Sequence, residues 1–303
     1  MRHSLAPLAV FAYNRPFHTR RVIEALRENS LAPRTDLYVF SDAPKSADME
    51  PRVNEVREYL QRVKGFRSLT IQRRETNAGL ARSIIEGVSQ ILAAHDRVIV
   101  MEDDLVTSPW FLAYMNNGLD AYADIQRVAS IHGYCYPVRR SLPETFFLRG
   151  GDCWGWATWR RAWATFEQDG AVLLSALKAR RLLSTFDLDG AYSFSGMLRD
   201  QVAGRNDSWA VRWHASCFLQ DMLTLYPGCS LVHNIGNDAS GTHSADVDDY
   251  ATAVADSPVR VERIEVVESE QARAAFAEFL RGTRGNLLQR AVAGLSRQLR
   301  SLR

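Results

Sequence analysis

The sequence predicts an α/β protein in which a mostly parallel sheet is flanked by helices and followed by a helical C-terminal tail. Two observations predict this class. Four short apolar runs alternate with three segments of helical periodicity over residues 1–125, a pattern typical of strands joined by crossover helices. Polar residues cluster after these runs, where sheets of this kind bind their ligands.

The predicted strands are residues 7–13, 36–44, 67–75 and 97–104, and the predicted helices are residues 17–29, 47–63 and 77–95. Apolar residues in these helices recur at a spacing of three or four, which forms one buried face. Because the carboxyl ends of parallel strands meet at one edge of a sheet, the polar groups after the strands are expected to form a single site. Those groups are Asn14 and Arg15, Ser41 and Asp42, Asn77, Gly79 and Arg82, and Glu102, Asp103 and Asp104.

The regular alternation weakens in the second half of the chain. Residues 127–136 predict a further strand, and residues 208–226 predict one helix that ends before Pro227. Another strand begins at Ser230 and leads into a loop that contains His243. Residues 268–282 predict a helix, because apolar and charged residues alternate there with helical spacing.

Composition excludes several classes of protein. The 303 residues are 46% hydrophobic, which is ample for a core, and the formal net charge of +2 gives no field that would attract nucleic acid. Four cysteines without a CxxC pair favour reduced thiols over a zinc site or a disulfide framework. No window approaches the roughly 18–20 apolar residues of a spanning helix. We therefore expect a cytoplasmic protein.

Three carboxylates, Glu102, Asp103 and Asp104, directly follow the buried run "VIVM". They could form a solvated turn, a pair for general acid–base work, or a divalent-cation site that holds a diphosphate. Hard carboxylate oxygens suit Mg²⁺ or Mn²⁺, and phosphate and water supply the remaining ligands in many such sites. The chain has no GxxxxGK[ST] loop, and no GxGxxG follows its first strand. A nucleotide would therefore be held by side chains at the strand ends.

Six segments then occur in an order that resembles one enzyme class. They are "VFAYNRP", "FSDAP", "NAGLARS", "VIVMEDDL", "GGDCWGWATWRRAW" and "DSWAVRW…LVHNIGNDASGTH". Over roughly residues 5–245 the chain resembles nucleotide-sugar glycosyltransferases of the GT-A fold. It looks like bacterial family 2-like sugar transferases and is distantly similar to N-acetylglucosaminyltransferase I. The resemblance implies a Rossmann-like GT-A domain over residues 1–245. Its nucleotide-binding half is residues 1–125, its acceptor half is residues 126–245, and residues 246–303 form a C-terminal extension.

The resemblance also implies roles for individual residues. Asp104 would bind Mn²⁺ or Mg²⁺, with Glu102 and Asp103 facing the ribose and sugar of the donor. Asp42 would contact the base or ribose. The other residues placed near the nucleotide are Asn14, Arg15, Asn77 and Arg82. The catalytic base would be Asp207, with Asp221 as the alternative. His243 is either a second metal ligand or a surface histidine, and Trp156 is either a wall of the sugar site or core packing.

The implied activity is transfer of a sugar from a nucleoside-diphosphate sugar, with UDP favoured, to a glycan or lipid-linked acceptor. The transfer would be inverting and cation-dependent, as in a bacterial hexosyl- or N-acetylhexosaminyltransferase of polysaccharide biosynthesis. The alternatives are a nucleotidyltransferase and a non-catalytic carbohydrate-binding protein on a decayed GT-A fold. Residues 286–303 predict a basic amphipathic helix. It would either dock on the domain or lie peripherally on an anionic membrane at its cytoplasmic face.

Overall fold

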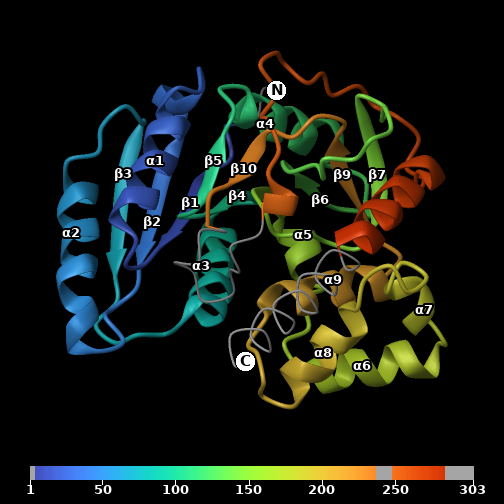
Figure 1. Ribbon diagram of the computed structural model, residues 1–303. Helices are drawn as coiled ribbons and strands as arrows, with labels where there is room; N and C mark the ends of the chain where they lie inside the picture. The colour runs from blue at the N-terminus through green and yellow to red at the C-terminus, as the bar shows by residue number, and fades with distance from the viewer. Residues whose placement is uncertain (1–3, 237–247, 284–303) are drawn as a thin grey trace, which may run out of the picture.

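The computed structural model describes residues 4–236 and 248–283, and it shows a mixed α/β fold built on one large sheet (Figure 1). The sheet has eight strands in the order β3-β2-β1-β4-β8-β6-β9-β7. All the pairings among β3, β2, β1 and β4 are parallel, as is the pairing of β6 with β9. The predicted fold class, a mostly parallel Rossmann-like sheet flanked by helices, is therefore confirmed.

The first half of the chain follows the predicted alternation closely. Its elements are β1 (Leu8–Ala12), α1 (Pro16–Arg27), β2 (Asp36–Ser41), α2 (Glu50–Gln61), β3 (Ser68–Arg73), α3 (Leu80–Ala94) and β4 (Arg97–Glu102). Side chains of β1 alternate between the two faces. Leu8 and Val10 pack with α1, whereas Ala9 and Phe11 pack with α3. The period of two in the strand thus gives the sheet two buried faces.

The second half contains more and shorter elements. They are β5 (Leu105–Thr107), α4 (Phe111–Ala121), β6 (Val128–His132), β7 (Thr145–Arg149), β8 (Trp156–Trp159), α5 (Arg160–Trp163), α6 (Gly170–Ala179), α7 (Leu183–Phe186), α8 (Phe194–Val202), α9 (Trp209–Leu219), β9 (Leu223–Pro227) and β10 (Val232–Asn234). Short 3₁₀ turns span Ala32–Arg34, Ala47–Met49 and Asp248–Tyr250. Strand β8 is antiparallel to both of its neighbours, β4 and β6. The predicted strands at β6 and β10 are confirmed.

The single helix predicted over residues 208–226 is wrong in its second half. Helix α9 ends at Leu219, and the next residues form β9, which lies between β6 and β7 in the sheet. The helix ends in a Schellman motif, because Met222 N donates to Cys217 O and Asp221 N donates to Phe218 O. Asp221 takes the left-handed position with φ of 55°. Glycine usually marks that position, so the sequence carries no signal for the helix end.

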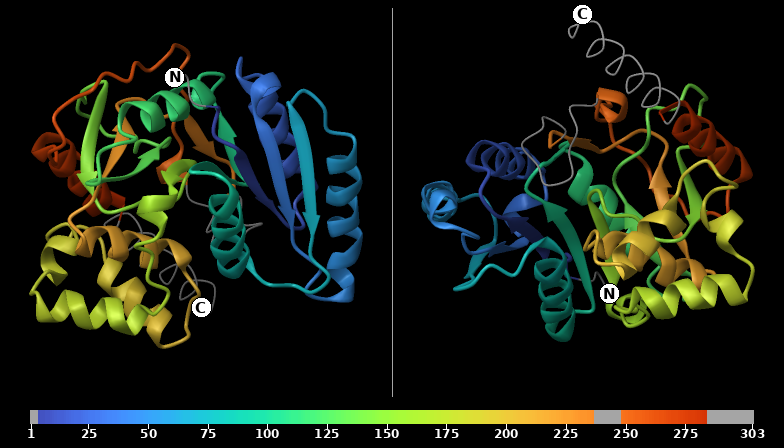
Figure 2. Two further views of the ribbon diagram at one scale, coloured as in Figure 1. Left: turned by 180° about the vertical axis from the view of Figure 1, so that it is seen from behind. Right: turned by 60° about the horizontal axis from the view of Figure 1, so that its bottom comes forward.

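Described residues of the C-terminal extension cover one end of the sheet. Ser108 Oγ donates to Ala255 O at 2.6 Å, and Tyr122 OH donates to Glu262 O at 3.1 Å. Residues 270–283 are helical, as predicted, and this helix lies beside β7 (Figure 2). Its Phe276 packs with Phe146 and Leu148 of β7 and Tyr226 of β9. The division of the chain at residue 245 stays a prediction. The predicted basic helix at residues 286–303 lies outside the described residues.

Within residues 4–236 and 248–283, no helix is long and apolar enough to cross a membrane.

We predict that Gly87→Ala destabilises the fold by about 1–3 kcal/mol through overpacking. A Cβ at Gly87 in α3 would lie 2.7 Å from the Phe11 ring, which itself stacks on Phe40. The expected change is opposite in sign to the usual one, because alanine in place of glycine inside a helix normally stabilises a protein by about 1 kcal/mol. Urea denaturation measures the change. The matched control is Gly196→Ala in α8, where a Cβ would meet only the Ser193 side chain, whose hydroxyl can rotate away. Equal stability of the Gly87 and Gly196 variants would contradict the prediction.

Candidate active site at the carboxyl edge of the sheet

The carboxylate triplet lies where β4 ends, beside the end of β1. Glu102 is the last residue of β4 and pairs in register with Phe11 of β1. Asp103 is 9% exposed, and its Oδ2 accepts hydrogen bonds from Tyr13 N at 3.1 Å and Thr19 Oγ1 at 3.4 Å. Asp103 therefore ties the turn after β4 to the β1–α1 junction.

Asp104 connects the triplet to two other segments. Its Oδ2 accepts from Arg15 Nη1 at 2.8 Å, and its main-chain oxygen accepts from Ile235 N at 2.8 Å. Gly236 packs so closely that a Cβ there would overlap the Asp104 carboxylate. The Asp104 side chain keeps 20% of its surface exposed. The triplet is thus a meeting point of the β1–α1 junction, the β4–β5 turn and residues 235–236.

Crowding and burial disfavour full ionisation of this triplet. Burial, followed by the charges of Asp104 and Asp103, raises the pKa of Glu102 well above its usual value, and Arg15 opposes the shift. Burial and the charge of Asp104 raise the pKa of Asp103 to about 7. One arginine therefore does not offset the negative charge of three carboxylates. A ligand that brings positive charge would be stabilised here.

Asp42 binds the turn that starts α3. The residue is 7% exposed, and its carboxylate accepts from Ala78 N at 3.0 Å, Gly79 N at 2.9 Å and Asn77 Nδ2 at 3.2 Å. Gly79 has φ of 74°, in the left-handed region that favours glycine. Asp42 and Asn77 thus fix the turn to the end of β2. Their predicted contacts with a nucleotide stay a prediction.

Asn14 and Arg82 make weaker or more exposed contacts. Asn14 Nδ2 lies 3.1 Å from Met49 Sδ, beside the β1–α1 junction. Arg82 is exposed on α3 and pairs with Glu86 one turn later at 2.6 Å. Asn14 therefore lies next to Arg15 and the triplet, whereas the Arg82 guanidinium is held on the helix surface. Their nucleotide contacts also remain predictions.

Trp156 is a core residue in this structure, which corrects its interpretation as a wall of the sugar site. It is 1% exposed and stacks on Trp209 with 5.5 Å between ring centroids. Trp163 and Trp213 complete the same cluster. The half-buried tryptophan of the glycine-rich loop is instead Trp154, which meets Tyr134 edge-on at 4.7 Å.

Asp152 also lies at this edge, in the loop that contains Trp154. Its carboxylate accepts from Tyr226 OH at 3.1 Å and lies 3.5 Å from His132 Nε2. Burial and then the charges of Asp152 and Glu102 raise the pKa of the neighbouring Cys153. A Cβ at Gly155 in the same loop would lie 3.2 Å from the sulfur of Met101, the residue before Glu102, so the loop lies beside the triplet. The sequence signal for Asp152 is its place directly after two glycines in "GGDCWGW".

Asp207 lies at the same edge as the triplet. Trp156 pairs with Val100 near the carboxyl end of β4, and Trp209 stacks on Trp156. Helix α9 begins at Trp209, so its N-terminus lies at this edge. Asp207 comes two residues earlier, is exposed, and pairs with Arg212 at 3.0 Å. This position agrees with the role predicted for Asp207, which stays a prediction.

Asp221 lies at the opposite edge, which corrects its place as the alternative base. It comes just before β9, where Leu223 N donates to Arg127 O ahead of β6. These are the amino ends of two parallel strands. Asp221 forms exposed ion pairs with Arg127 at 2.8 Å and Arg149 at 3.3 Å. The length of the sheet therefore separates it from the triplet.

The described residues hold only part of a cation site. Among residues 4–236 and 248–283, no three histidine, cysteine, aspartate or glutamate side chains are grouped so that they could hold a metal ion. The partly exposed Asp104 carboxylate offers hard oxygen atoms, which fit Mg²⁺ or Mn²⁺ if phosphate and water supply the other ligands. His243, the other predicted ligand, lies outside the described residues.

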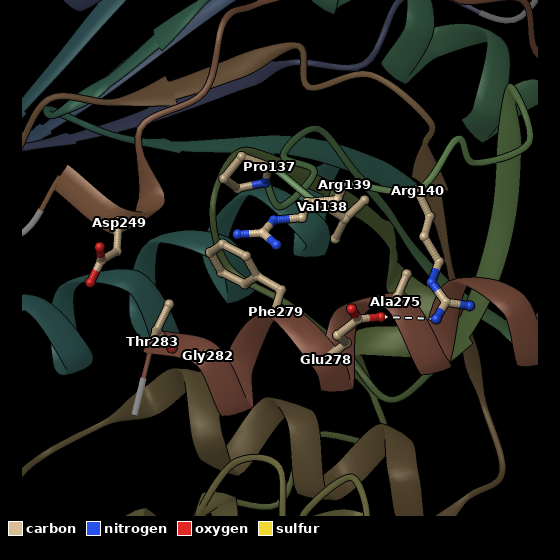
Figure 3. Close-up of a pocket in the computed structure, with 10 residues that line it drawn as sticks. All are labelled: Pro137, Val138, Arg139, Arg140, Asp249, Ala275, Glu278, Phe279, Gly282 and Thr283. Carbon is tan, nitrogen blue, oxygen red and sulfur yellow. Dashed lines mark ion pairs between the residues drawn. The ribbon is translucent and has the colours of Figure 1, made fainter. Parts of the chain in front are cut away.

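A separate cavity of about 440 Å³ lies between residues 137–140 and the helix at residues 270–283 (Figure 3). Arg140 and Glu278 form an ion pair of 3.1 Å at its rim, and Phe279 points into it. Of the predicted site residues that the structure describes, none lines this cavity. It is therefore distinct from the carboxylate edge.

Comparison with solved structures gives distant likenesses. A putative nucleotide-diphospho-sugar transferase from Desulfovibrio desulfuricans has 12% identity and a TM-score of 0.33, with 53% of this chain and 65% of that chain covered. A Pyrobaculum calidifontis mannosyltransferase, solved with GDP-Man and Mn²⁺, has 12% identity and a TM-score of 0.36, covering 72% and 69%. A putative glucose-1-phosphate thymidylyltransferase from Bacillus anthracis has 12% identity and a TM-score of 0.31, covering 53% and 74%.

Other comparisons give no match: no protein-family model matches the chain, and no curated protein does. The chain spans less than two thirds of the Desulfovibrio protein. Because every TM-score quoted is below 0.5, the function has to be inferred from the residues of this chain.

We predict that Glu102→Gln stabilises the cation-free protein at pH 8 but changes it little near pH 4.5. Folding raises the pKa of Glu102. Above about pH 4.3 the unfolded chain therefore loses the proton of this carboxyl group, whereas the native state keeps it. Native stability therefore falls as pH rises, and glutamine removes this loss. Urea denaturation at both pH values measures it. The control is Glu86→Gln, since Arg82 and Arg74 lower the pKa of Glu86. No gain for Glu102→Gln at pH 8 would contradict the prediction.

Proposed function

We propose that this protein transfers a sugar from a nucleoside-diphosphate sugar, with UDP favoured, to a glycan or lipid-linked acceptor. The transfer uses Mn²⁺ or Mg²⁺ and inverts the anomeric configuration. The observation that carries the proposal is the triplet at the end of β4, where burial and mutual repulsion raise the pKa values of Glu102 and Asp103. Two carboxylates whose ionisation is disfavoured, next to the partly exposed Asp104, are best explained by a ligand that supplies positive charge.

Asp104 is the cation ligand in this proposal. Its carboxylate keeps exposed surface and is paired with Arg15, a cation on the neighbouring junction. A bound divalent cation would neutralise the diphosphate and the charge that develops on the leaving group. Asp103, which is held by Tyr13 and Thr19, fixes the backbone from which Asp104 projects. Arg15 would turn from the Asp104 carboxylate to a phosphate oxygen.

The nucleotide would lie across the ends of β1 and β2. Asp42 and Asn77 form one side of this region, and Asn14 and Arg15 form the other. Asp42 already accepts several hydrogen bonds from the turn after β3, so we propose that it shapes the nucleoside site as well as contacting the ligand. Arg82 is placed at the rim, where its contact with Glu86 is exposed to solvent.

Asp207 is the proposed base. An inverting base takes the proton of the acceptor hydroxyl on the side of the sugar away from the leaving group. Asp207 lies at the carboxyl edge on a different element from Asp104, and its side chain is 73% exposed. The adjacent Arg212 is largely buried and orients the carboxylate at 3.0 Å. A carboxylate in this position is free to reach an acceptor.

Two other functions remain as alternatives. A nucleotidyltransferase usually carries a glycine-rich basic loop after its first strand, whereas the junction after β1 reads Asn14-Arg15-Pro16. A carbohydrate-binding protein without activity has no use for the unfavourable charge of the triplet. Peripheral membrane attachment through residues 286–303 is a separate proposal. It would suit a lipid-linked acceptor.

Nucleotide-sugar hydrolysis tests the proposed function. UDP-, GDP- and CMP-sugars are incubated with the protein and either Mn²⁺ or EDTA, and the released nucleotide is quantified. We expect metal-dependent release from one nucleotide class. Diphosphate release from a nucleoside triphosphate and a sugar phosphate would support a nucleotidyltransferase instead. Binding of free glycans without any nucleotide binding would support the carbohydrate-binding alternative.

We predict that Asp104→Ala abolishes Mn²⁺-dependent binding of the nucleoside diphosphate and leaves the thermal midpoint nearly unchanged. The side chain supplies the only direct protein ligand proposed among the described residues, and its removal leaves the core intact. Isothermal calorimetry measures the affinity. The control is Asp124→Ala, which removes an exposed carboxylate paired with Arg263. Unchanged Mn²⁺-dependent affinity in the Asp104 variant would refute its assignment.

We predict that Asp207→Asn lowers kcat for transfer by roughly 100-fold or more, the scale of a lost general base. Asparagine keeps the size of the side chain but accepts no proton, so nucleotide binding should persist. Asp221→Asn is the matched control at the opposite edge of the sheet and should retain activity. Loss of transfer in the Asp221 variant, with activity kept in the Asp207 variant, would show that the base was assigned to the wrong residue.

A further inference from the structure

A buried histidine at the end of β6 lacks the hydrogen bonds that its ring requires. His132 is 1% exposed, and neither ring nitrogen has a hydrogen-bond partner among the described residues. The nearby charge is the Asp152 carboxylate, whose Oδ2 lies 3.5 Å from His132 Nε2. An unsatisfied buried polar group costs about 1–3 kcal/mol. The fold therefore keeps His132 in place at a cost.

Asp152 joins this buried histidine to the solvent side of the edge. Its Oδ2 accepts from Tyr226 OH at 3.1 Å, and its Oδ1 accepts from Cys153 N at 2.7 Å. The side chain nevertheless remains 26% exposed. Each carboxylate oxygen can accept two hydrogen bonds, so acceptor capacity is left for a ligand. The protein thus uses part of the acceptor capacity of this carboxylate and leaves part of the side chain exposed.

Aromatic side chains surround the same carboxylate. Burial and then the charge of Asp152 raise the pKa values of Tyr226 and Tyr136 well above the usual value, so both phenols stay protonated. Trp154, two residues after Asp152, is half-buried between Tyr134 and Tyr250. A carboxylate beside partly exposed aromatic rings is suited to a ring that carries hydroxyl groups and apolar C–H faces.

The neighbouring residues place this group beside the proposed reaction site. A Cβ at Gly155, three residues after Asp152, would lie 3.2 Å from the sulfur of Met101, the residue before Glu102. The loop that contains Asp152 therefore approaches the triplet. His132 and Tyr226 come from β6 and β9, two adjacent strands of the same sheet. Residues of two adjacent strands therefore contact the Asp152 carboxylate, and Tyr226 holds it by a hydrogen bond.

We propose that Asp152 accepts hydrogen bonds from the hydroxyl groups of a sugar bound at this edge. Tyr226, whose hydroxyl donates to this carboxylate, is the positioning residue that orients it, and His132 lies 3.5 Å away. The inference rests on the proposed function and deepens it by assigning a sugar-recognition residue. The sugar is that of the donor or that of the acceptor, and both offer the same hydroxyl chemistry. A purely structural network would stabilise the fold without any effect on sugar affinity.

The test compares nucleotide and nucleotide-sugar affinities in matched variants. Asp152→Asn keeps the shape but removes the charge, and Tyr226→Phe removes only the phenol oxygen. Tyr114→Phe is the control, because the Tyr114 hydroxyl is also buried but has no hydrogen-bond partner among the described residues. Calorimetry with Mn²⁺ uses UDP against UDP-glucose and UDP-N-acetylglucosamine, and GDP against GDP-mannose. Saturation-transfer NMR follows binding of methyl glycosides to the nucleotide-loaded protein.

If the donor sugar is bound, Asp152→Asn weakens nucleotide-sugar binding by about 10- to 100-fold, the scale of a charged hydrogen bond. Tyr226→Phe weakens it less, and the affinity for UDP or GDP stays within about twofold. If the acceptor is bound, the same loss appears in methyl glycoside binding instead. Unchanged sugar affinity in both variants, or an equal loss in Tyr114→Phe, overturns this inference alone. Wild-type protein that binds neither UDP nor GDP overturns the proposed function and this inference together.

Discussion

The electrostatic cost of three adjacent carboxylates at the end of β4 is the constraint on which this site depends. Glu102 and Asp103 are desolvated by the core and repelled by each other and by Asp104. The surrounding chain offsets part of this cost with the Tyr13 amide, the Thr19 hydroxyl and the Arg15 guanidinium. All three groups come from residues 13–19, at the β1–α1 junction, so the triplet also joins this junction to the end of β4. A bound cation would neutralise the remaining negative charge of the triplet and could in turn bind a diphosphate.

The order of strands then decides what surrounds the triplet. Parallel pairing places the ends of β1, β2 and β4 at one edge, and the antiparallel β8 brings the loop of Asp152 and Trp154 to the same edge. Helix α9 runs back from this edge, so Asp207 lies near the site and Asp221 lies far from it. Residues that are distant in sequence thus converge by topology, although each is held by local contacts. Donor, acceptor and base positions can then be formed on separate elements.

Much of the fold could be predicted because the spacing of apolar residues alone indicates the strands β1 to β4 and the helices α1 to α3. The position of the triplet also followed, since carboxyl ends of parallel strands share an edge. Other features depended on tertiary contacts that no local pattern encodes. Asp221 takes a left-handed conformation without glycine, and Trp156 is buried by three other tryptophans. The role proposed for Asp152 depends on its contacts with His132 and Tyr226, which lie on β6 and β9.

Electron paramagnetic resonance of Mn²⁺ tests the central claim most directly, because it reports cation binding without a known acceptor. The signal of free Mn²⁺ is recorded with UDP or GDP alone and again after the protein is added. The predicted result is a further loss of free signal that saturates at about one Mn²⁺ per chain and requires the nucleotide. The same free signal with and without protein, for every nucleoside diphosphate tried, would contradict a cation–diphosphate site at the end of β4.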